Sequence, residues 1–335
     1  MTDLKKTFGT EKPIVAMCHF RALVGDPKFA TDSDSSMERV VELARKDPRI
    51  VAVSCDSCSG GGLSAFFQEF PERSIETGIS EQNAVSLCAA LARQGLKPVL
   101  VIINPFLTMR AYEQVRDDAG YMNTNVVMVG SGGGLAYSTL GSTHIAVEDV
   151  GLMRSVPHLT ILAPGDGDEV EFALEQALSV DGPVYIRMPR QARNAPVEGE
   201  RKMELGKAEV LAEGSEALLC AYGPSAEEAM KACRILQEQG KAITVLNFTT
   251  VKPLDAEAVL AHTKGKKAVF TLEEHAPVGG LGSAVAEVLA EAGAGVPLHR
   301  LAVPEGAKQT GPYPELVAYY GLDGESVAKQ IAEVL

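Results

Sequence analysis

The sequence predicts an α/β protein of two domains, each built around a parallel β-sheet. From about residue 48 onward, short apolar runs rich in β-branched residues alternate with amphipathic segments of helical period. Strand, loop, helix and strand in this order are typical of parallel sheets. The strand segments are almost continuously apolar, which predicts that both faces of the first sheet are covered.

Five strands are predicted in the first domain, at residues 50–53, 98–103, 125–129, 159–162 and 183–187. Residues 81–93 and 168–178 carry apolar side chains at helical spacing, so they are predicted to be helices. The polar segment that follows the last strand holds Pro and Gly and shows no period, which is typical of a linker.

A second α/β domain follows this linker. Its strands are predicted at residues 217–222, 243–248 and 268–272, and its helices at residues 225–239, 282–292 and 325–334. Before the first domain, residues 12–17 are predicted to form a strand and residues 36–46 a helix, with Ser36 near its N-cap. The predicted organisation is an N-terminal segment at 1–47, a first domain at 48–193, a linker at 194–208 and a second domain at 209–335.

Composition excludes several classes of function. The 335 residues include 44 acidic and 31 basic side chains, for a net charge of −13, and such a surface repels nucleic acids and anionic lipids. The sequence has no stretch near the roughly 20 apolar residues that cross a bilayer and no signal-peptide pattern at its polar start. Six cysteines in this context fit reduced thiols. We expect a cytoplasmic protein that binds neither nucleic acid nor membrane.

Two kinds of motif suggest chemistry that the rest of the sequence does not complete. Cys55 and Cys58 have the spacing of a zinc or redox pair, but no second ligand pair follows, so we expect a structural or incidental role and no metal site. The alternative is a thioredoxin-like pair, because the two cysteines follow a strand. Gly-rich loops at 60–62, 130–134 and 279–282 lack the spacing of a dinucleotide-binding fingerprint. They indicate only where the backbone approaches something closely.

Glu81 is the first candidate for a functional side chain. It stands where a Gly-containing loop enters the predicted helix at 81–93. One interpretation is helix capping, because Ser80 is a good N-cap and an acid in the first turn favours the helix dipole. The other is a carboxylate that serves a binding site. Spacing alone favours capping.

The segment Gly78-Ile-Ser-Glu-Gln-Asn83 resembles the GIAEQN signature of the pyrimidine-binding domain of transketolases and deoxyxylulose-phosphate synthases. Similar motifs follow in the family's order, at residues 105–115, 140–154, 181–190, 251–255 and 273–282. The resemblance covers residues 48–335 and implies a pyrimidine-binding domain followed by a transketolase C-terminal domain. Residues 8–23 instead resemble the first strand of BtpA-like TIM-barrel proteins.

The cofactor of this family is thiamine diphosphate, so the resemblance implies roles for individual residues. Glu81 matches the carboxylate that bonds N1′ of the aminopyrimidine and thereby promotes loss of the C2 proton. Phe106, Met109 and Tyr112 lie in the segment that walls the aminopyrimidine. The alternative for Met109 and Tyr112 is an ordinary place in the core.

The resemblance also implies residues that contact substrate. His144 matches a histidine that touches the substrate and the reactive end of the cofactor, where an imidazole donates or relays a proton. Arg190 matches an arginine that holds the substrate phosphate. Arg110 is a second candidate for an anion contact, or for pairing with a neighbouring acid.

One departure from the family concerns the metal. The domain that binds diphosphate and Mg²⁺ is missing, and the family's Gly-Asp-Gly letters occur only at residues 165–167, in the wrong domain. The resemblance therefore implies the C-terminal subunit of a split transketolase. An N-terminal partner subunit would supply the ligands of Mg²⁺ and diphosphate, in an α2β2 heterotetramer.

The leading prediction is a transferase of carbohydrate metabolism that moves a two-carbon ketol unit from a ketose, expected to be phosphorylated, to an aldose. Leu140 stands where the family has an acid that recognises a substrate hydroxyl, which leaves the identity of the sugars open. The alternatives are a β-type subunit of a 2-oxoacid dehydrogenase and a catalytically silent regulatory subunit. Deoxyxylulose-phosphate synthase is disfavoured because it is normally one chain.

Overall fold

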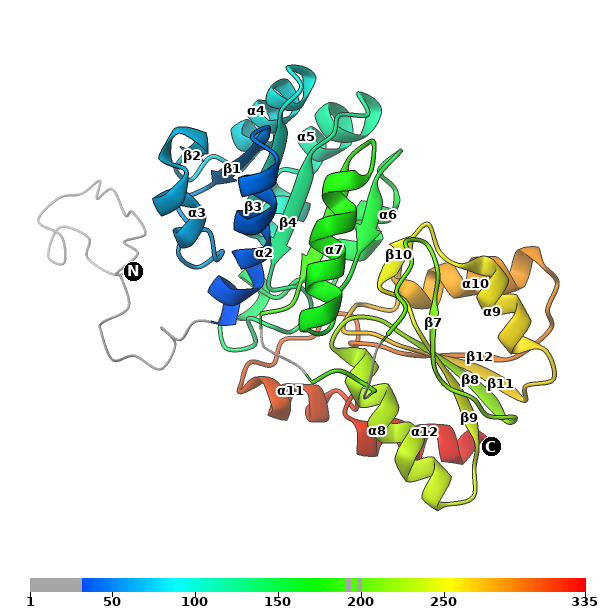
Figure 1. Ribbon diagram of the computed structural model, residues 1–335. Helices are drawn as coiled ribbons and strands as arrows, with labels where there is room; N and C mark the ends of the chain where they lie inside the picture. Colours follow the sequence, from blue (N-terminus) through cyan, green and yellow to red (C-terminus); the bar gives the residue numbers. More distant parts are fainter. Residues whose placement is uncertain (1–31, 191–193, 198–200) are drawn as a thin grey trace, which may run out of the picture. The chain divides into compact units, whose positions relative to one another are not determined.

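The computed structural model describes residues 32–190, 194–197 and 201–335, with side chains from residue 37 onward (Figure 1). The strand predicted at residues 12–17, and the segment at 8–23 that resembles BtpA-like proteins, lie outside these residues. Helix α2 runs over Asp32–Lys46, so it begins four residues before the predicted Ser36.

Within the described residues, the first sheet has seven strands. Their order is β10 (Thr250–Lys252), β5 (Thr160–Leu162), β6 (Val184–Met188), β4 (Val127–Ser131), β3 (Lys97–Ile103), β1 (Ile50–Ser54) and β2 (Ser74–Glu76). All neighbouring strands are parallel except β10, which runs antiparallel to β5 and comes from the part of the chain assigned to the second domain. The second domain therefore contributes an edge strand to the first sheet.

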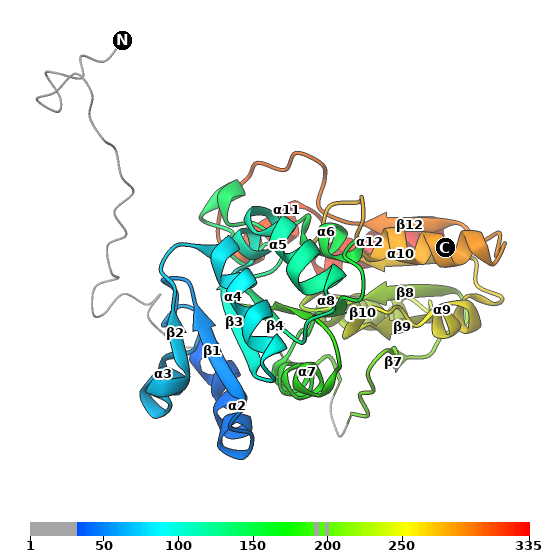
Figure 2. The same ribbon diagram turned by 90° about the horizontal axis from the view of Figure 1, so that it is seen from above.

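Both faces of this sheet are covered, as predicted. Along β3, Val99 and Val101 pack in one core cluster with residues of α2 and of α7 (Gly167–Ser179). Leu100 and Ile102 alternate with them and pack in another cluster with residues of α4 (Glu81–Arg93). Figure 2 shows α2 and α7 on the side of the strands opposite α4. Helix α3 (Ser64–Glu69) contacts α2.

The second sheet has five strands among the described residues. Their order is β12 (Leu298–Leu301), β11 (Ala268–Leu272), β8 (Ala217–Ala221), β9 (Ile243–Asn247) and β7 (Glu209–Ala212). They are parallel except for β7 at the edge, which runs antiparallel to β9. Helices cover both faces, with α8 (Ser225–Glu238) and α12 (Gly324–Val334) on one and α9 (Ala256–Thr263) and α10 (Leu281–Glu291) on the other (Figure 1).

The predicted α/β class is confirmed, with one antiparallel edge strand in each sheet. Helix α4 has the predicted bounds, and the central strands lie within two residues of their predicted positions. Four edge strands of three or four residues were not predicted: β2, β7, β10 and β12. Such short strands carry too few side chains to show a period.

Candidate functional site

Glu81 lies in the first turn of α4, and its side chain is buried although it is charged. The residue is only 3% exposed, and Oε1 accepts a hydrogen bond of 2.6 Å from Nη1 of Arg110. Ser80 occupies the N-cap position, but its hydroxyl donates to the carbonyl of Thr77 and caps no helix amide. Side-chain capping by Ser80 therefore does not account for this helix start, and the Glu81 carboxylate faces another element of the fold.

That element is the π-helical turn Phe106–Arg110, which directly follows β3. The Arg110 guanidinium carbon lies 4.0 Å from the centre of the Phe106 ring, so the cation stacks on the ring while it bonds Glu81. The Arg110 side chain is 40% exposed. It pairs with a neighbouring acid, which is the alternative that the sequence left open, and its exposure leaves it accessible to an anion.

His144 reaches the same place from a different segment. It belongs to residues 132–148, between β4 and α6 (Asp149–Arg154), which we call the His144 loop. The imidazole packs edge-on against Phe106, with ring centres 5.2 Å apart, and against Tyr137 at 5.7 Å. Its Nδ1 atom lies 2.8 Å from Oγ1 of Thr143. The loop therefore places His144 against the aromatic ring that carries Arg110.

Arg190 extends the series at its far end. Its guanidinium carbon lies 4.3 Å from the centre of the Tyr137 ring, and the residue is exposed. Successive contacts thus link six side chains, which we call the site rim: Glu81, Arg110, Phe106, His144, Tyr137 and Arg190. They come from four separate segments: the start of α4, the turn Phe106–Arg110, the His144 loop and the residues after β6.

Two predicted residues lie beside this series. Met109 is half-buried in the same turn as Phe106. The hydroxyl of Tyr112 lies 2.7 Å from Oγ of Ser155, and its ring packs partly buried against the core. Tyr137 was missed, because a single tyrosine between a Gly-rich loop and residues 140–144 carries no signal of its own. Leu140 is 51% exposed in the His144 loop.

The fold also contains a set of buried polar side chains, which we call the buried cluster: Asn104, Asp149, Tyr185, Arg187, Glu274 and His275. Oδ2 of Asp149 accepts from Nε of Arg187 at 2.7 Å, from Asn104 at 2.8 Å and from the Tyr185 hydroxyl at 2.9 Å. Burial alone would raise the pKa of Asp149, but Arg187 and His275 lower it below its usual range. The aspartate is therefore an ionised partner of a buried arginine.

The second domain supplies two members of the buried cluster. Nη2 of Arg187 donates to the backbone carbonyl of Glu274 at 2.9 Å, and the Gly151 amide donates to Nε2 of His275 at 3.1 Å. These residues lie in the motifs at 140–154, 181–190 and 273–282, but the resemblance implied no role for them. Polar groups at the junction of two domains need a tertiary partner that a sequence pattern does not reveal.

The Gly-rich loops approach protein groups. A Cβ on Gly133 would lie 2.6 Å from the Arg187 side chain, and one on Gly134 would lie 2.7 Å from Oε2 of Glu274. Gly280 and Gly282 flank the start of α10, where the Glu273 carboxylate accepts from the amides of Leu281 and Gly282. These close approaches account for Gly133, Gly134 and Gly280, where a Cβ would meet a neighbouring side chain.

The remaining candidates for chemistry are the thiols and possible metal ligands. Sγ of Cys55 lies 3.2 Å from Oγ1 of Thr77, and burial raises the pKa of the thiol, which keeps it protonated. In the described part of the chain, no group of three or more His, Cys, Asp or Glu side chains could hold a metal ion. The same residues include no helix that is long and apolar enough to cross a membrane.

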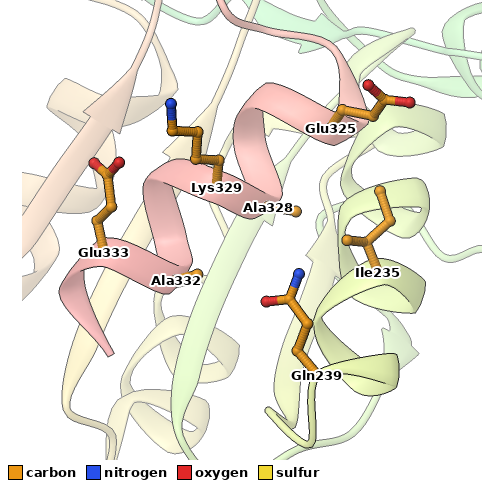
Figure 3. Close-up of a pocket in the computed structure, with 7 residues that line it drawn as sticks. All are labelled: Ile235, Gln239, Glu325, Ala328, Lys329, Ala332 and Glu333. Atoms are coloured by element: carbon orange, nitrogen blue, oxygen red, sulfur yellow. The ribbon is translucent and has the colours of Figure 1, made fainter.

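A separate groove lies between α8 and α12 in the second domain (Figure 3). Its lining residues are Ile235, Gln239, Glu325, Ala328, Lys329, Ala332 and Glu333. None of the site residues predicted from the sequence lies in it. The rim, and not this groove, gathers the predicted side chains.

Comparisons with known proteins identify both domains. The family model described as the transketolase pyrimidine binding domain matches residues 30–195, and that of the transketolase C-terminal domain matches residues 206–327. The first match includes α2, which the sequence analysis placed in the N-terminal segment.

Curated relatives fall into two groups by length. The chain is 40% identical over 294 residues to 1-deoxy-D-xylulose-5-phosphate synthase 1 of Geobacter sulfurreducens, covering 87% of this chain and 46% of that protein. It thus spans about half the length of this relative. It covers 93% of two shorter relatives. One, provisionally named a transketolase C-terminal section, is from Methanocaldococcus jannaschii (35% identity); the other is the 6-deoxy-6-sulfo-D-fructose transketolase subunit SqwH of a Clostridium species (36%). These matches cover 88% and 90% of this chain.

Solved structures agree with this assignment. One described as a split gene transketolase, inactive beta4 tetramer, has a TM-score of 0.79 and 31% identity, covering 90% of this chain and 97% of that one. A transketolase of Pichia stipitis shares the fold, with a TM-score of 0.75 at 18% identity, over 90% of this chain and 45% of its own. The resemblance read from the motifs is confirmed: the chain belongs to the transketolase family, with the pyrimidine-binding domain followed by the C-terminal domain.

Proposed function

We propose that the chain is the C-terminal subunit of a thiamine diphosphate-dependent enzyme that transfers a two-carbon ketol unit from a phosphorylated ketose to an aldose. The observation that carries the proposal is the buried Glu81 carboxylate, which is linked through Arg110 and Phe106 to His144. A buried carboxylate in the first turn of a helix, beside an aromatic face and an imidazole, combines a proton acceptor with a proton relay.

The residues present fit the aminopyrimidine part of the cofactor. When bound, thiamine diphosphate supplies a nucleophilic carbon that attacks a ketose carbonyl. Glu81 would hold a ring nitrogen of the aminopyrimidine, and Phe106, Met109 and Tyr112 would wall it. Because Arg110 is partly exposed, it can move away from Glu81 when a ligand group takes its place, so that the buried carboxylate keeps a hydrogen-bond partner.

The other end of the rim would bind the substrate. His144 would hold or move a proton at the substrate's oxygen, because an imidazole both donates and accepts near neutral pH. Arg190 would bind the phosphate through its planar fork of donors, and Arg110 is a second cation for an anionic group. Leu140, exposed in the same loop, offers an apolar contact in place of a hydroxyl-binding acid.

A partner subunit would complete the enzyme. The residues described here bring together no cluster of metal ligands, so we assign the ligands of Mg²⁺ and diphosphate to an N-terminal subunit, in an α2β2 assembly. Two relatives of nearly the same length support this: a transketolase subunit, and a split gene transketolase whose beta4 tetramer is described as inactive. By analogy, this chain alone would associate with itself and remain inactive.

A second candidate reaction is the synthesis of 1-deoxy-D-xylulose 5-phosphate. It is favoured by the 40% identity to the synthase of Geobacter sulfurreducens. Supplying the reconstituted enzyme with ketose donors in one assay and with the synthase's substrates in another separates the two reactions.

The test is titration calorimetry with thiamine diphosphate and Mg²⁺, followed by a ketol-transfer assay. Both use the chain alone and mixed with a candidate N-terminal transketolase subunit. We expect binding and transfer only in the mixture, and loss of transfer by about 100-fold or more in Glu81→Gln. The matched control is Glu113→Gln, at an exposed glutamate of helix α5 (Tyr112–Gln114), which should leave ketol transfer unchanged.

Two results would contradict the proposal. Tight cofactor binding by the chain alone would show that it needs no partner for diphosphate and Mg²⁺. Full transfer activity in Glu81→Gln would favour a catalytically silent subunit whose partner carries the chemistry. Complex formation is checked by size-exclusion chromatography, so that a wrong partner is recognised as such.

A further inference from the structure

The His144 loop closes on itself at its base. The amide of Gly134 donates to the carbonyl of Ala146, and the amide of Ala146 donates to the carbonyl of Gly134, both at 3.0 Å. Tyr137 and His144 of the site rim lie between these two residues, three and two positions from the base. The position of the base therefore determines where these two rings stand.

The second domain holds this base from the other side. Oε2 of Glu274 accepts from the Leu135 amide at 3.0 Å, and the Ala276 amide donates to the Val147 carbonyl at 2.6 Å. The side chains of Leu135 and Val147 belong to the core cluster that contains the strands of the second sheet. A loop of the first domain is thus anchored in the second.

Glu274 is itself fixed in place. It is 3% exposed, and Oε1 accepts from the hydroxyl of Tyr313, the first residue of α11 (Tyr313–Tyr319). Gly134 has a φ of 65°, and a Cβ there would meet the Glu274 carboxylate at 2.7 Å. The loop base and the carboxylate are therefore in close contact, and only glycine fits between them.

We propose that Glu274 is a positioning residue: from the C-terminal domain, its carboxylate sets the place of the His144 loop and thus of the imidazole in the active site. The expected effect on catalysis rests on the proposed function. The fixing of the loop rests on the contacts above. Without the carboxylate, the Leu135 amide is buried without an acceptor, and the loop base loses its link to α11.

Three variants of the full-length chain test this in the complex with its partner subunit. Glu274→Ala removes both hydrogen bonds. Glu274→Gln restores them, because its carbonyl accepts from Leu135 and its amide group donates to the oxygen of Tyr313. Glu228→Ala is the matched control: Glu228 is also buried and accepts a backbone amide of the second domain, that of Gly324 at 2.9 Å, at the start of α12.

The first readout is amide hydrogen exchange, which does not depend on activity. In Glu274→Ala we expect the amides of Leu135 and Ala146 to exchange about tenfold faster or more, with β8 unchanged. The second is ketol transfer, in which we expect kcat to fall about tenfold or more, since the imidazole moves away from its working position. Glu274→Gln should recover most of the slow amide exchange and most of kcat, and Glu228→Ala should change neither quantity.

The outcomes separate the two proposals. An inactive wild-type complex would contradict the proposed function, while hydrogen exchange would still decide whether Glu274 holds the loop. Unchanged exchange at Leu135 and Ala146, or an equal effect of Glu228→Ala, would overturn the positioning role. So would faster exchange with undiminished kcat. If Glu274→Ala does not fold, Tyr313→Phe replaces it, and an exchange increase confined to the His144 loop is then required.

Discussion

The site rim and the buried cluster each contain an arginine that pairs with a carboxylate, and the two pairs differ in what surrounds them. Arg187 is 3% exposed and donates to Asp149 and to two backbone carbonyls, those of Ala146 and Glu274. Arg110 is 40% exposed and bonds one carboxylate, Glu81, while it stacks on a ring. Both carboxylates are buried, but the Arg187 guanidinium is buried as well, whereas Arg110 is partly exposed and can turn to solvent if a ligand group takes its place at Glu81. This difference supports the proposal that the rim binds ligands while the buried cluster maintains the fold around it.

The largest effect is expected when the buried pair of Asp149 and Arg187 is broken. Asp149→Ala leaves the Arg187 guanidinium buried without its counter-charge, so we expect the free energy of unfolding to fall by about 3–5 kcal/mol. Arg190→Ala, at the exposed end of the rim, should change it by less than about 0.5 kcal/mol. Urea denaturation of both variants measures the two values. Equal losses of unfolding free energy would show that the buried cluster and the site rim contribute alike to stability.

A second buried cluster also lies at the junction of the domains, and it differs from the cluster around Arg187 because its arginine pairs with more than one carboxylate. Arg201 bonds three carboxylates, those of Asp166, Glu169 and Glu209. Burial, with Asp166 nearby, raises the pKa of Glu169 from 4.5 to about 7. By contrast, the single aspartate paired with Arg187 has a lowered pKa. An excess of acid thus leaves one carboxyl group that binds a proton near neutral pH.

This difference predicts a pH dependence of stability. Between about pH 4.5 and 7 the folded chain binds a proton at Glu169 that the unfolded chain has lost, so this group's contribution is present at low pH and is lost as the pH rises through 7. Its size is about 3 kcal/mol. In urea denaturation from pH 5 to pH 8, Glu169→Gln should therefore gain stability relative to the wild type as the pH rises. A difference that stays constant with pH would contradict this.

At the rim, the expected effect is on activity and not on folding. His144→Asn should lower ketol transfer in the complex by about 100-fold or more, because no other group takes over the proton at that place. The free energy of unfolding should change by less than about 1 kcal/mol, since the residue is only half-buried. His158→Asn is the control, at an exposed histidine whose φ of 60° suits asparagine. Parallel losses in both variants would remove His144 from the mechanism.

Much of the rim could be predicted from the sequence, because its residues sit in short motifs that keep their order. Helix α4 was predicted with its bounds, since its apolar period and the loop before it are local properties. The buried cluster could not be predicted, because each member is satisfied by a residue from a distant segment, such as Arg187 by Asp149 and by the Glu274 carbonyl. The antiparallel β10 has only three residues, too few to show a period, and its partner, β5, lies in the other domain, so neither the strand nor its pairing could be predicted.

The smallest effect is expected at Arg190, and it tests whether this end of the rim binds a phosphate. Arg190 is exposed and stacks on Tyr137, so its removal costs little in folding and leaves the imidazole of His144 in place. In Arg190→Ala we expect KM for a phosphorylated ketose to rise about tenfold with kcat unchanged, because a phosphate contact of this kind binds ground state and transition state alike. KM for the same ketose without its phosphate should not move. An equal rise for both donors would mean that Arg190 shapes the rim through Tyr137 and does not bind the phosphate, and Arg110 would then be the cation to test next.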